Sequence, residues 1–401
     1  MTESKYSHRR ARALRAAVRD AKRGLDAFLV SKVEDVGYLS GFTGDDSLLL
    51  VARGWACLLT DGRYDEQARA ECPGVDVFVR KVGMPEAVAY VVKTLRIANC
   101  ELRIPAEGAK EPNEGKFTIH NPQFTIRIRR LAVQADHFTI RAGEAYAKAL
   151  GGGVRLIPVG DVTGALRQVK DDGEVRQIRK AIAAAQGAFK ALLAQGAGAF
   201  VGRTERQVAA ELDYRMRLAG ADKPSFDTIV AAGPHASLPH YRPGGTRITR
   251  GTPVLIDWGA FVGGYCSDLT RVVFPGRIPP KLAEIYPIVQ RAQKAGMAAV
   301  RAGASARAVD AAARSVIKKA GYDKEFVHGL GHGIGRQIHE LPGVGRLAKV
   351  RLKAGMVVTV EPGIYLPGVG GVRIEDDVLV CPQGHERLSS LPTALEAMTV
   401  R

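Results

Sequence analysis

Apolar residues recur at every third or fourth position in several segments of the chain, a spacing that places them on one face of an α-helix. This spacing predicts helices over residues 86–95, 171–195, 204–218, 281–301 and 305–320. Near the start of the chain, Leu14, Val18, Ala21 and Leu25 follow the same spacing. They predict an amphipathic first helix whose many basic residues face water.

Short apolar runs bounded by glycine and polar residues predict β-strands. Such runs lie at residues 24–30, 47–51, 56–60, 227–232, 253–258, 266–274, 356–361 and 372–380. The second and third runs flank an Arg53-Gly54 turn and predict a hairpin.

The glycine-rich stretch 151–160 separates two regions with different patterns. Strands and helices alternate before it, whereas hairpins separated by pairs of helices follow it. A chain of 401 residues is also too long for one ordinary hydrophobic core. We therefore expect an N-terminal α/β domain over residues 1–160 and a C-terminal α+β domain over residues 161–401.

The composition is that of a globular protein, with 46% hydrophobic and 25% charged residues. No apolar run approaches the roughly 18 residues of a membrane span, so we expect no membrane partner. The number of cysteines is odd and no CxxC occurs, which favours a reducing, cytoplasmic location. These cysteines are Cys57, Cys72, Cys100, Cys266 and Cys381.

The net charge of +17 is spread over both regions, with +6 in residues 1–160 and +11 in residues 161–401. No pattern typical of an RNA-binding or zinc-finger module accompanies this charge. We therefore interpret it as general surface basicity and expect no specific nucleic-acid partner.

Two aspartates, Asp257 and Asp268, interrupt the otherwise apolar segment VLIDWGAFVGGYCSDLTRVVF at residues 254–274. Burying a carboxylate without a partner is costly. A two-residue turn near Val262-Gly263-Gly264 places both on one face of a hairpin, either directly opposite or diagonal to each other. Two like charges at that distance repel unless a cation lies between them.

A second hairpin is predicted in VTVEPGIYLPGVGGVRIEDDVLV, at residues 358–380. A symmetric turn centred on Gly368 places Glu361 and Glu375 on one face. By the same alternation, Asp376 points to the other face of its strand, and we expect Asp377 at the rim.

His332 lies between the two hairpins in GLGHGIGRQIHELP, framed by glycines that let the backbone approach closely. Four carboxylates and one imidazole form an oxygen-rich ligand set that suits Mn²⁺, Co²⁺, Fe²⁺ or Zn²⁺. Four negative charges balance two divalent ions. The sequence therefore predicts a dinuclear site that activates water for hydrolysis, against the alternative of separate solvated or salt-bridged acids.

These motifs, in this order and spacing, resemble those of the pita-bread metallopeptidases, in particular the aminopeptidase P and prolidase branch. The matching segments are VLIDWGAFVGGYCSDLTR, GLGHGIGRQIHE, VTVEPGIY and GVRIEDDVLV. VGYLSGFTGDDSLLLV and LTDGRYDEQA resemble the creatinase-like N-terminal domain of that branch. The resemblance implies a non-catalytic α/β domain over residues 1–160 and a pita-bread catalytic domain over residues 161–401.

The resemblance also implies a role for each predicted metal ligand. Asp257 would bind one metal through both oxygens, and Asp268 and Glu375 would bridge the pair. His332 and Glu361 would complete the shell of the other metal. A metal-bridging hydroxide would attack the scissile carbonyl, and Glu361 would accept the proton of the attacking water.

Further residues match substrate-site positions of the family. His240 and His339 would hydrogen-bond the substrate carbonyl or the tetrahedral intermediate. Arg373 would share the site-facing side of its strand, where it pairs with a carboxylate or orients the substrate. We expect His235 to be a surface residue and Cys266 to be a small thiol that fills the core.

The implied activity is removal of an N-terminal residue that precedes proline, with two divalent ions, Mn²⁺ first and Zn²⁺ or Co²⁺ as alternatives. The implied partners are a peptide with proline at its second position and further copies of the chain, in a homodimer or homotetramer. The nearest alternative is an Xaa-Pro dipeptidase (prolidase). Methionine aminopeptidases usually lack the N-terminal domain, creatinase-like hydrolases dispense with the metal ligands, and a non-catalytic binding module would not require them.

Overall fold

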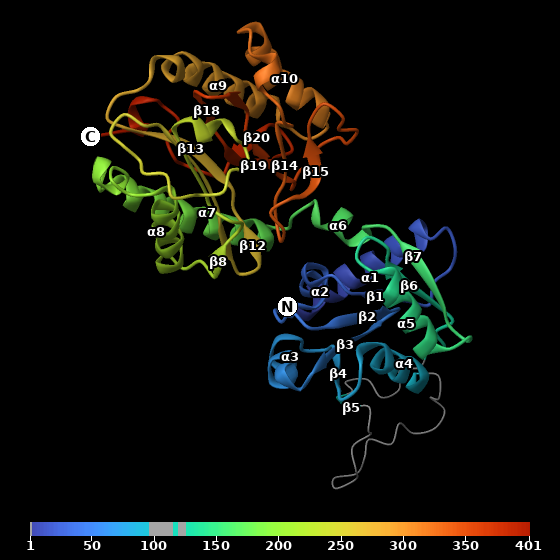
Figure 1. Ribbon diagram of the computed structural model, residues 1–401. Helices are drawn as coiled ribbons and strands as arrows, with labels where there is room; N and C mark the ends of the chain where they lie inside the picture. The colour runs from blue at the N-terminus through green and yellow to red at the C-terminus, as the bar shows by residue number, and fades with distance from the viewer. Residues whose placement is uncertain (1, 96–114, 119–125) are drawn as a thin grey trace. The chain divides into compact units, whose positions relative to one another are not determined.

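The computed structural model describes residues 2–95, 115–118 and 126–401, and the chain divides into two compact units (Figure 1). Unit 1 is Met1–Arg167 and unit 2 is Gln168–Arg401. The division therefore falls after residue 167, where the sequence predicts it after residue 160.

Unit 1 is built on a seven-stranded mixed sheet with the order β5-β4-β3-β2-β1-β6-β7. Its strands are β1 (Ala27–Val30), β2 (Leu48–Ala52), β3 (Trp55–Asp61), β4 (Asp76–Arg80), β5 (Gly115–Thr118), β6 (Arg130–Gln134) and β7 (Arg155–Val159). Its helices are α1 (Thr2–Asp20), α2 (Val33–Ser40), η1 (Gly62–Tyr64), α3 (Asp65–Glu71), α4 (Met84–Thr94), α5 (Ile140–Leu150) and α6 (Val162–Arg167). The predicted hairpin is β2–β3, which confirms that interpretation.

Alternate residues of the sheet in unit 1 enter two separate cores, because successive side chains of a strand point to opposite faces. Ala27 and Leu29 of β1 pack in the core that contains residues of α4 and α5. Phe28 and Val30 pack in the core that contains residues of α1, α2 and α3. Unit 1 is therefore a three-layer α/β domain, as predicted.

The first helix differs from its prediction in its end, in its most buried residues and in the place of one basic residue. It ends at Asp20, and its most buried apolar residues are Ala13 and Ala17. Arg9 is also buried, and its Nη1 donates to the carbonyl oxygen of Tyr38 over 3.1 Å. Its guanidinium lies 4.1 Å from the centre of the Tyr38 ring. The expectation that all basic residues of this helix face water is therefore wrong at Arg9, where a cation–π contact accompanies the hydrogen bond.

Unit 2 carries several small sheets, with the orders β21-β13-β10-β9, β12-β11-β8, β15-β14-β16-β19-β20 and β17-β18. Its first strands are β8 (Lys223–Pro224), β9 (Ile229–Ala232), β10 (Val254–Trp258), β11 (Ala260–Val262), β12 (Tyr265–Cys266) and β13 (Leu269–Pro275). The others are β14 (Gly331–Gly333), β15 (Glu340–Val344), β16 (Val357–Val360), β17 (Gly363–Leu366), β18 (Gly370–Arg373), β19 (Asp376–Val380), β20 (His385–Arg387) and β21 (Thr399–Val400).

The helices of unit 2 are α7 (Asp172–Leu193), η2 (Gly196–Ala199), α8 (Glu205–Leu218), η3 (Gly233–Ser237), α9 (Pro280–Ala299), α10 (Ala306–Lys319), η4 (Asp323–Glu325) and η5 (Glu396–Met398). Figure 1 shows α7 and α8 on one side of the strands and α9 and α10 on the other. The four α-helices agree with the predicted ranges. Asp171 begins α7 with a capping box, because its side chain accepts from the amide of Glu174 while Glu174 accepts from the amide of Asp171.

Strand register in the two predicted hairpins agrees with the sequence. In the first, Asp257 pairs with Thr270, so Asp268 is the diagonal neighbour of Asp257 across the strands. In the second, Gly363 pairs with Arg373, a register symmetric about Gly368. An isolated bridge between Thr270 and Glu375 joins the two hairpins. Among the described residues, every helix is too short or too polar to span a bilayer.

Candidate metal centre

The ligands predicted from the two hairpins come together within unit 2. Ligand atoms of Asp268, His332 and Glu375 all lie within 4.8 Å of one another. His332 Nε2 lies 3.5 Å from Asp268 Oδ2 and 3.5 Å from Glu361 Oε1. Asp257 lines the same cavity as these four residues. One imidazole and four carboxylates thus share one small region.

Thr270 and Arg373 connect the carboxylates of the two hairpins. Thr270 Oγ1 donates to Glu375 Oε2 over 2.6 Å. Arg373 Nη2 donates to Asp257 Oδ2 over 2.6 Å, and its Nε donates to Thr270 Oγ1 over 3.0 Å. We expect Arg373 either to pair with a carboxylate or to orient the substrate, and the structure shows the pair with a carboxylate.

The imidazole of His332 is oriented by its own backbone. Its Nδ1 lies 3.0 Å from the carbonyl oxygen of Gly333, so we assign the ring hydrogen to Nδ1. The lone pair of Nε2 then faces the carboxylates, as a metal ligand requires. The amide of His332 donates to Thr359 Oγ1 over 3.1 Å. The close approach of the backbone at His332 to Thr359 requires glycine at position 331, where a Cβ would lie 2.1 Å from the Thr359 carbonyl oxygen.

Electrostatic repulsion and burial disfavour the charged form of these carboxylates when no cation is present. Burial, followed by the charges of Glu375 and Asp257, raises the pKa of Asp268 well above its usual range. Burial, followed by the charge of Glu361, does the same to the pKa of Glu375. Burial also raises the pKa of Glu361 to about 7. Arg373 offers one positive charge against four carboxylates.

Unpaired oxygens indicate what the site accepts. Asp257 Oδ1 and Glu375 Oε1 are buried and have no hydrogen-bond partner in the part of the chain that the structure describes. Leaving a buried acceptor unsatisfied costs about 1–3 kcal/mol, and more for a charged group. Burial lowers the pKa of His332 to about 4, so its imidazole is neutral at pH 7. Anionic oxygens and a neutral imidazole fit divalent metal ions.

A cavity of about 390 Å³ opens beside the carboxylates. His240 and His339 both line it, and the rings of His339 and His332 lie 4.4 Å apart in an edge-to-face arrangement. Burial and then the neighbouring His240 lower the pKa of His339. Apolar side chains complete the walls, among them Phe226, Ile229, Pro239 and Ile338.

Residues of the site that the sequence did not reveal include His328 and Tyr365. Tyr365 OH lies 2.8 Å from His328 Nε2 and accepts a hydrogen bond from Arg373 Nη1 over 2.8 Å. His328 Nδ1 lies 2.7 Å from the carbonyl oxygen of Gly329, so Nδ1 carries the hydrogen and Nε2 accepts from Tyr365. Burial lowers the pKa of His328 to about 4. The only signal in the sequence is their spacing, four residues before His332 and four after Glu361.

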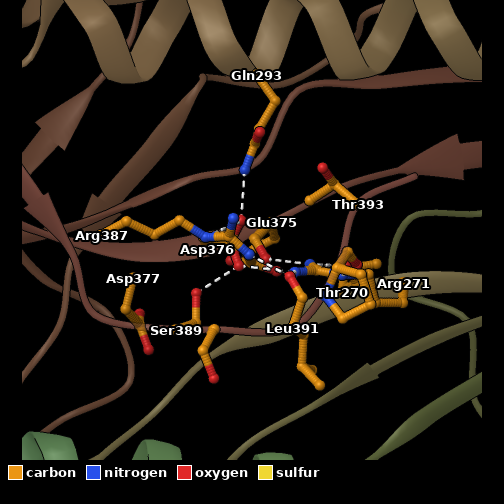
Figure 2. Close-up of polar contacts among 12 residues, drawn as sticks. Thr270, Arg271, Gln293, Glu375, Asp376, Asp377, Arg387, Ser389, Leu391 and Thr393 are labelled. Atoms are coloured by element: carbon orange, nitrogen blue, oxygen red, sulfur yellow. Dashed lines mark hydrogen bonds and ion pairs between the residues drawn. The ribbon is translucent and has the colours of Figure 1, made fainter. Parts of the chain in front are cut away.

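The expectation that Asp377 lies at the rim is wrong. Asp377 is fully buried, because the chain at Asp268 packs against its face of β19. Its Oδ2 accepts from the amide of Asp268 over 3.1 Å, and burial raises its pKa well above the usual range. Asp376 does point to the opposite face, where it meets Arg271 and Gln293 (Figure 2).

His235 keeps 35% of its side chain exposed, in keeping with a place at the surface, but it is also held by specific contacts. Its ring stacks on Tyr241 with the centroids 4.4 Å apart, and its Nδ1 lies 2.8 Å from Glu205 Oε1. Cys266 is buried as expected, and burial raises the pKa of its thiol to about 12. Cys100 lies outside the described residues.

Comparisons with known proteins identify the family of both domains. The family model described as metallopeptidase family M24 matches residues 176–382, and that of the creatinase/prolidase N-terminal domain matches residues 10–169. An Xaa-Pro dipeptidase of Pyrococcus furiosus is 45% identical over 231 residues, which are 58% of this chain and 66% of that protein.

Two solved structures resemble the whole chain. An Xaa-Pro dipeptidase from Bacillus anthracis has a TM-score of 0.85 and 34% identity, over 98% of this chain and 100% of that one. An X-Pro aminopeptidase from Thermotoga maritima has a TM-score of 0.79 and 34% identity, over 92% of this chain and 97% of that one.

Proposed function

The chain belongs to metallopeptidase family M24, with a creatinase-type N-terminal domain before a pita-bread domain, and on this premise we propose that it hydrolyses Xaa-Pro dipeptides. The observation that carries the proposal is the convergence of the five predicted ligands on one wall of a cavity lined by two further histidines. These ligands are Asp257, Asp268, His332, Glu361 and Glu375.

We infer that the five ligands hold two divalent ions, with Mn²⁺ preferred because most donors are carboxylate oxygens. When bound, such a pair supplies Lewis acidity and lowers the pKa of a water so that it becomes a nucleophile at neutral pH. Asp268 and Glu375, which come from different hairpins, would both hold these ions. Their mutual repulsion would then be offset by the positive charge of the metal.

Glu361 is the candidate proton acceptor. Its pKa of about 7 without metal means that burial has made this carboxylate more basic than an exposed glutamate. Thr359 Oγ1 donates to Glu361 Oε1 over 3.2 Å and holds the carboxylate toward the cavity.

His240 and His339 are the candidate donors to the substrate carbonyl. Both line the cavity, and the lowered pKa of His339 keeps that ring neutral at pH 7. A neutral imidazole can still donate one N–H to an oxygen on which negative charge develops in the transition state.

The preference for proline rests on its chemistry and on relatives. An Xaa-Pro bond has no N–H for an enzyme to bind, so recognition has to come from the ring and from the carbonyl. The apolar side chains of the cavity supply a surface for such a ring. Relatives named Xaa-Pro dipeptidase and X-Pro aminopeptidase support this substrate class.

Two observations favour a dipeptide over the longer peptides that the sequence analysis placed first. The cavity of about 390 Å³ is near the small end of ligand pockets, which span roughly 300–1,000 Å³. The relatives described above also include dipeptidases from two organisms. Aminopeptidase activity is the second candidate, supported by the Thermotoga maritima structure.

The test is hydrolysis of an Xaa-Pro dipeptide and of the matching Xaa-Pro-Xaa tripeptide. The enzyme is first stripped with a chelator, and Mn²⁺, Co²⁺ or Zn²⁺ is then added back. We expect activity on the dipeptide only after a divalent ion is restored, highest with Mn²⁺. Equal cleavage of the tripeptide would favour the aminopeptidase, and full activity in the chelator would rule out a metallopeptidase.

A further inference from the structure

Arg271 follows Thr270 on β13, so its side chain points to the face opposite that of Thr270 and Asp268, where it is fully buried. Figure 2 shows it beside Asp376. An arginine side chain has five N–H groups, and in Arg271 the guanidinium makes five hydrogen bonds. Its acceptors are the carbonyl oxygens of Thr270 (2.8 Å), Glu375 (2.6 Å), Leu391 (3.1 Å) and Pro392 (3.0 Å) and the carboxylate of Asp376 (2.8 Å).

Asp376 holds Arg271 in place and is itself held from several sides. It is fully buried, and its Oδ2 accepts from Gln293 Nε2 over 2.6 Å. Ser389 Oγ donates to its Oδ1, and Arg387 Nε lies 3.1 Å from its Oδ2. Figure 2 shows these side chains converging on Asp376 from different segments of unit 2.

The backbone that Arg271 binds is the backbone that carries the metal ligands. Thr270 and Glu375 form the bridge between the two hairpins, and the amide of Glu375 donates to the carbonyl oxygen of Thr270 over 3.3 Å. Arg271 donates to both of those residues' carbonyl oxygens through one nitrogen, Nη1. Asp257 is the cross-strand partner of Thr270, and Asp268 precedes Thr270 by two residues.

We propose that Arg271 is a positioning residue for the metal centre, which fixes the spacing of the Asp268 and Glu375 carboxylates by clamping the bridge between their strands. The inference rests on the proposed function, since it needs the two-metal site. Well-packed apolar residues can replace a buried ion pair without loss of stability, so stability alone does not require arginine here. Only a planar fork with five donors can hold three segments of backbone in one geometry.

The decisive variant is Arg271→Lys, which keeps the positive charge but has one nitrogen in place of three. We expect the weaker of two Mn²⁺ binding steps to lose about tenfold or more in affinity, as for other residues that orient metal ligands. Titration calorimetry on metal-free protein measures both steps. The electron paramagnetic resonance spectrum of the Mn²⁺-loaded protein reports the exchange coupling between two ions, and we expect that coupling to change.

The matched control is Arg167→Lys in unit 1. Arg167 is also a buried arginine, paired with the buried carboxylate of Asp35. We expect this control to unfold at a lower temperature than the unchanged protein and to bind Mn²⁺ with unchanged affinity and spectrum. A general loss of stability would lower the melting temperature of both variants. It would leave the exchange coupling between the two Mn²⁺ ions unchanged in both.

A milder variant keeps the inference testable if Arg271→Lys does not fold. Gln293→Leu removes one hydrogen bond to Asp376 and keeps the volume of the side chain, and Gln293 Oε1 has no hydrogen-bond partner to lose among the described residues. We expect a loss of Mn²⁺ affinity on the order of fivefold, the equivalent of about 1 kcal/mol for one hydrogen bond.

The outcomes separate the two proposals. If the unchanged protein binds no pair of Mn²⁺ ions, the proposed function fails. If it does, and folded Arg271→Lys binds both ions with the same affinities and the same spectrum, the positioning role is overturned. Should Arg271→Lys be unfolded, unchanged Mn²⁺ binding by Gln293→Leu overturns it equally.

Discussion

Each unit of the chain buries acidic side chains, and the two units treat them differently. In unit 1, Asp35 is fully buried, and both of its oxygens are paired: Arg167 Nη1 lies 2.5 Å from Oδ1 and Gln134 Nε2 lies 2.6 Å from Oδ2. In unit 2, Asp257 and Glu375 each keep one buried oxygen without a partner among the described residues.

The comparison teaches that burial of an acid does not by itself identify a site. What distinguishes the site is the count of donors and charges around the carboxylate. Two consecutive residues make the same point. Asp376 receives hydrogen bonds from Arg271, Gln293 and Ser389, whereas one buried oxygen of Glu375 has no donor among the described residues. The paired acids stabilise the fold, whereas each unpaired acid keeps an oxygen that can bind a cation.

The largest effect is expected from Asp268→Asn, which removes one charge from the four carboxylates of the metal centre and keeps the shape of the side chain. Loss of a metal ligand costs several kcal/mol of transition-state stabilisation, so kcat/KM should fall on the order of a thousandfold. The metal-free variant should melt no lower than the unchanged metal-free protein, because a buried repulsion has been relieved. Steady-state kinetics and thermal scans measure the two quantities, and a variant with undiminished activity would falsify the ligand role.

Arg167→Met tests the paired group of unit 1. Removing one partner of a buried ion pair typically costs about 3–5 kcal/mol, because the other charge is left uncompensated. The chain has two tryptophans, Trp55 in unit 1 and Trp258 in unit 2. Denaturant unfolding of single-tryptophan variants therefore follows each unit separately. We expect the free energy of unfolding to fall in the transition that Trp55 reports.

The control for that experiment is the double variant Asp35→Leu, Arg167→Met, in which no buried charge remains. We expect it to recover most of the lost stability. In both variants kcat/KM per folded molecule should equal that of the unchanged protein. If kcat/KM of the folded molecules fell tenfold or more, the ion pair of unit 1 would take part in activity.

Glu205 sharpens the comparison, because it is a fully paired buried acid next to the substrate cavity. Its carboxylate accepts from the amides of Ala232 (2.9 Å) and Gly244 (3.0 Å) and from Tyr241 OH (2.8 Å). These donors lie on the segment that carries His240. We expect Glu205→Gln to raise KM about fivefold through looser placement of His240, the equivalent of one hydrogen bond, with little change in Mn²⁺ affinity. An unchanged KM would limit Glu205 to a stabilising role.

The smallest expected effect is a pH dependence of the metal-free protein. The raised pKa of Glu361, about 7 against 4.5 when unfolded, contributes stability below 4.5 that is lost as pH rises through 7. The raised pKa values of Asp268 and Glu375 change stability with pH in the same direction. The lowered pKa of His332, about 4 against 6.5, acts in the opposite sense, but its contribution is complete above 6.5.

Above pH 6.5, therefore, the carboxylates determine how the stability of the metal-free protein changes with pH. We expect the melting temperature of unit 2 to fall by about 3 °C between roughly pH 6.5 and 8 without metal, and to stay level once Mn²⁺ is bound. Differential scanning calorimetry at several pH values measures it. Asp268→Asn should show a shallower slope, and a metal-free protein that gains stability over this range would contradict the repulsion described here.

Local pattern predicted much of the structure because helices and hairpins depend on near neighbours. The four α-helices of unit 2 and the hairpin symmetric about Gly368 follow from periodicity and turn chemistry. The pattern did not predict β20, which pairs with β19 at the edge of its sheet. Nor did it predict that Arg9 packs on Tyr38, a contact across 29 residues.

The sequence by itself determined which side chains of each hairpin share a face, since that depends only on alternation and on the length of the turn. It also determined the kind of site, because carboxylates and imidazole are the ligands of hard and borderline divalent ions. Only the tertiary structure decided that Thr270 and Glu375 join the hairpins, that Arg373 pairs with Asp257, and that His328 meets Tyr365. Those contacts join segments far apart in the chain, where no local period or turn constrains which residues meet.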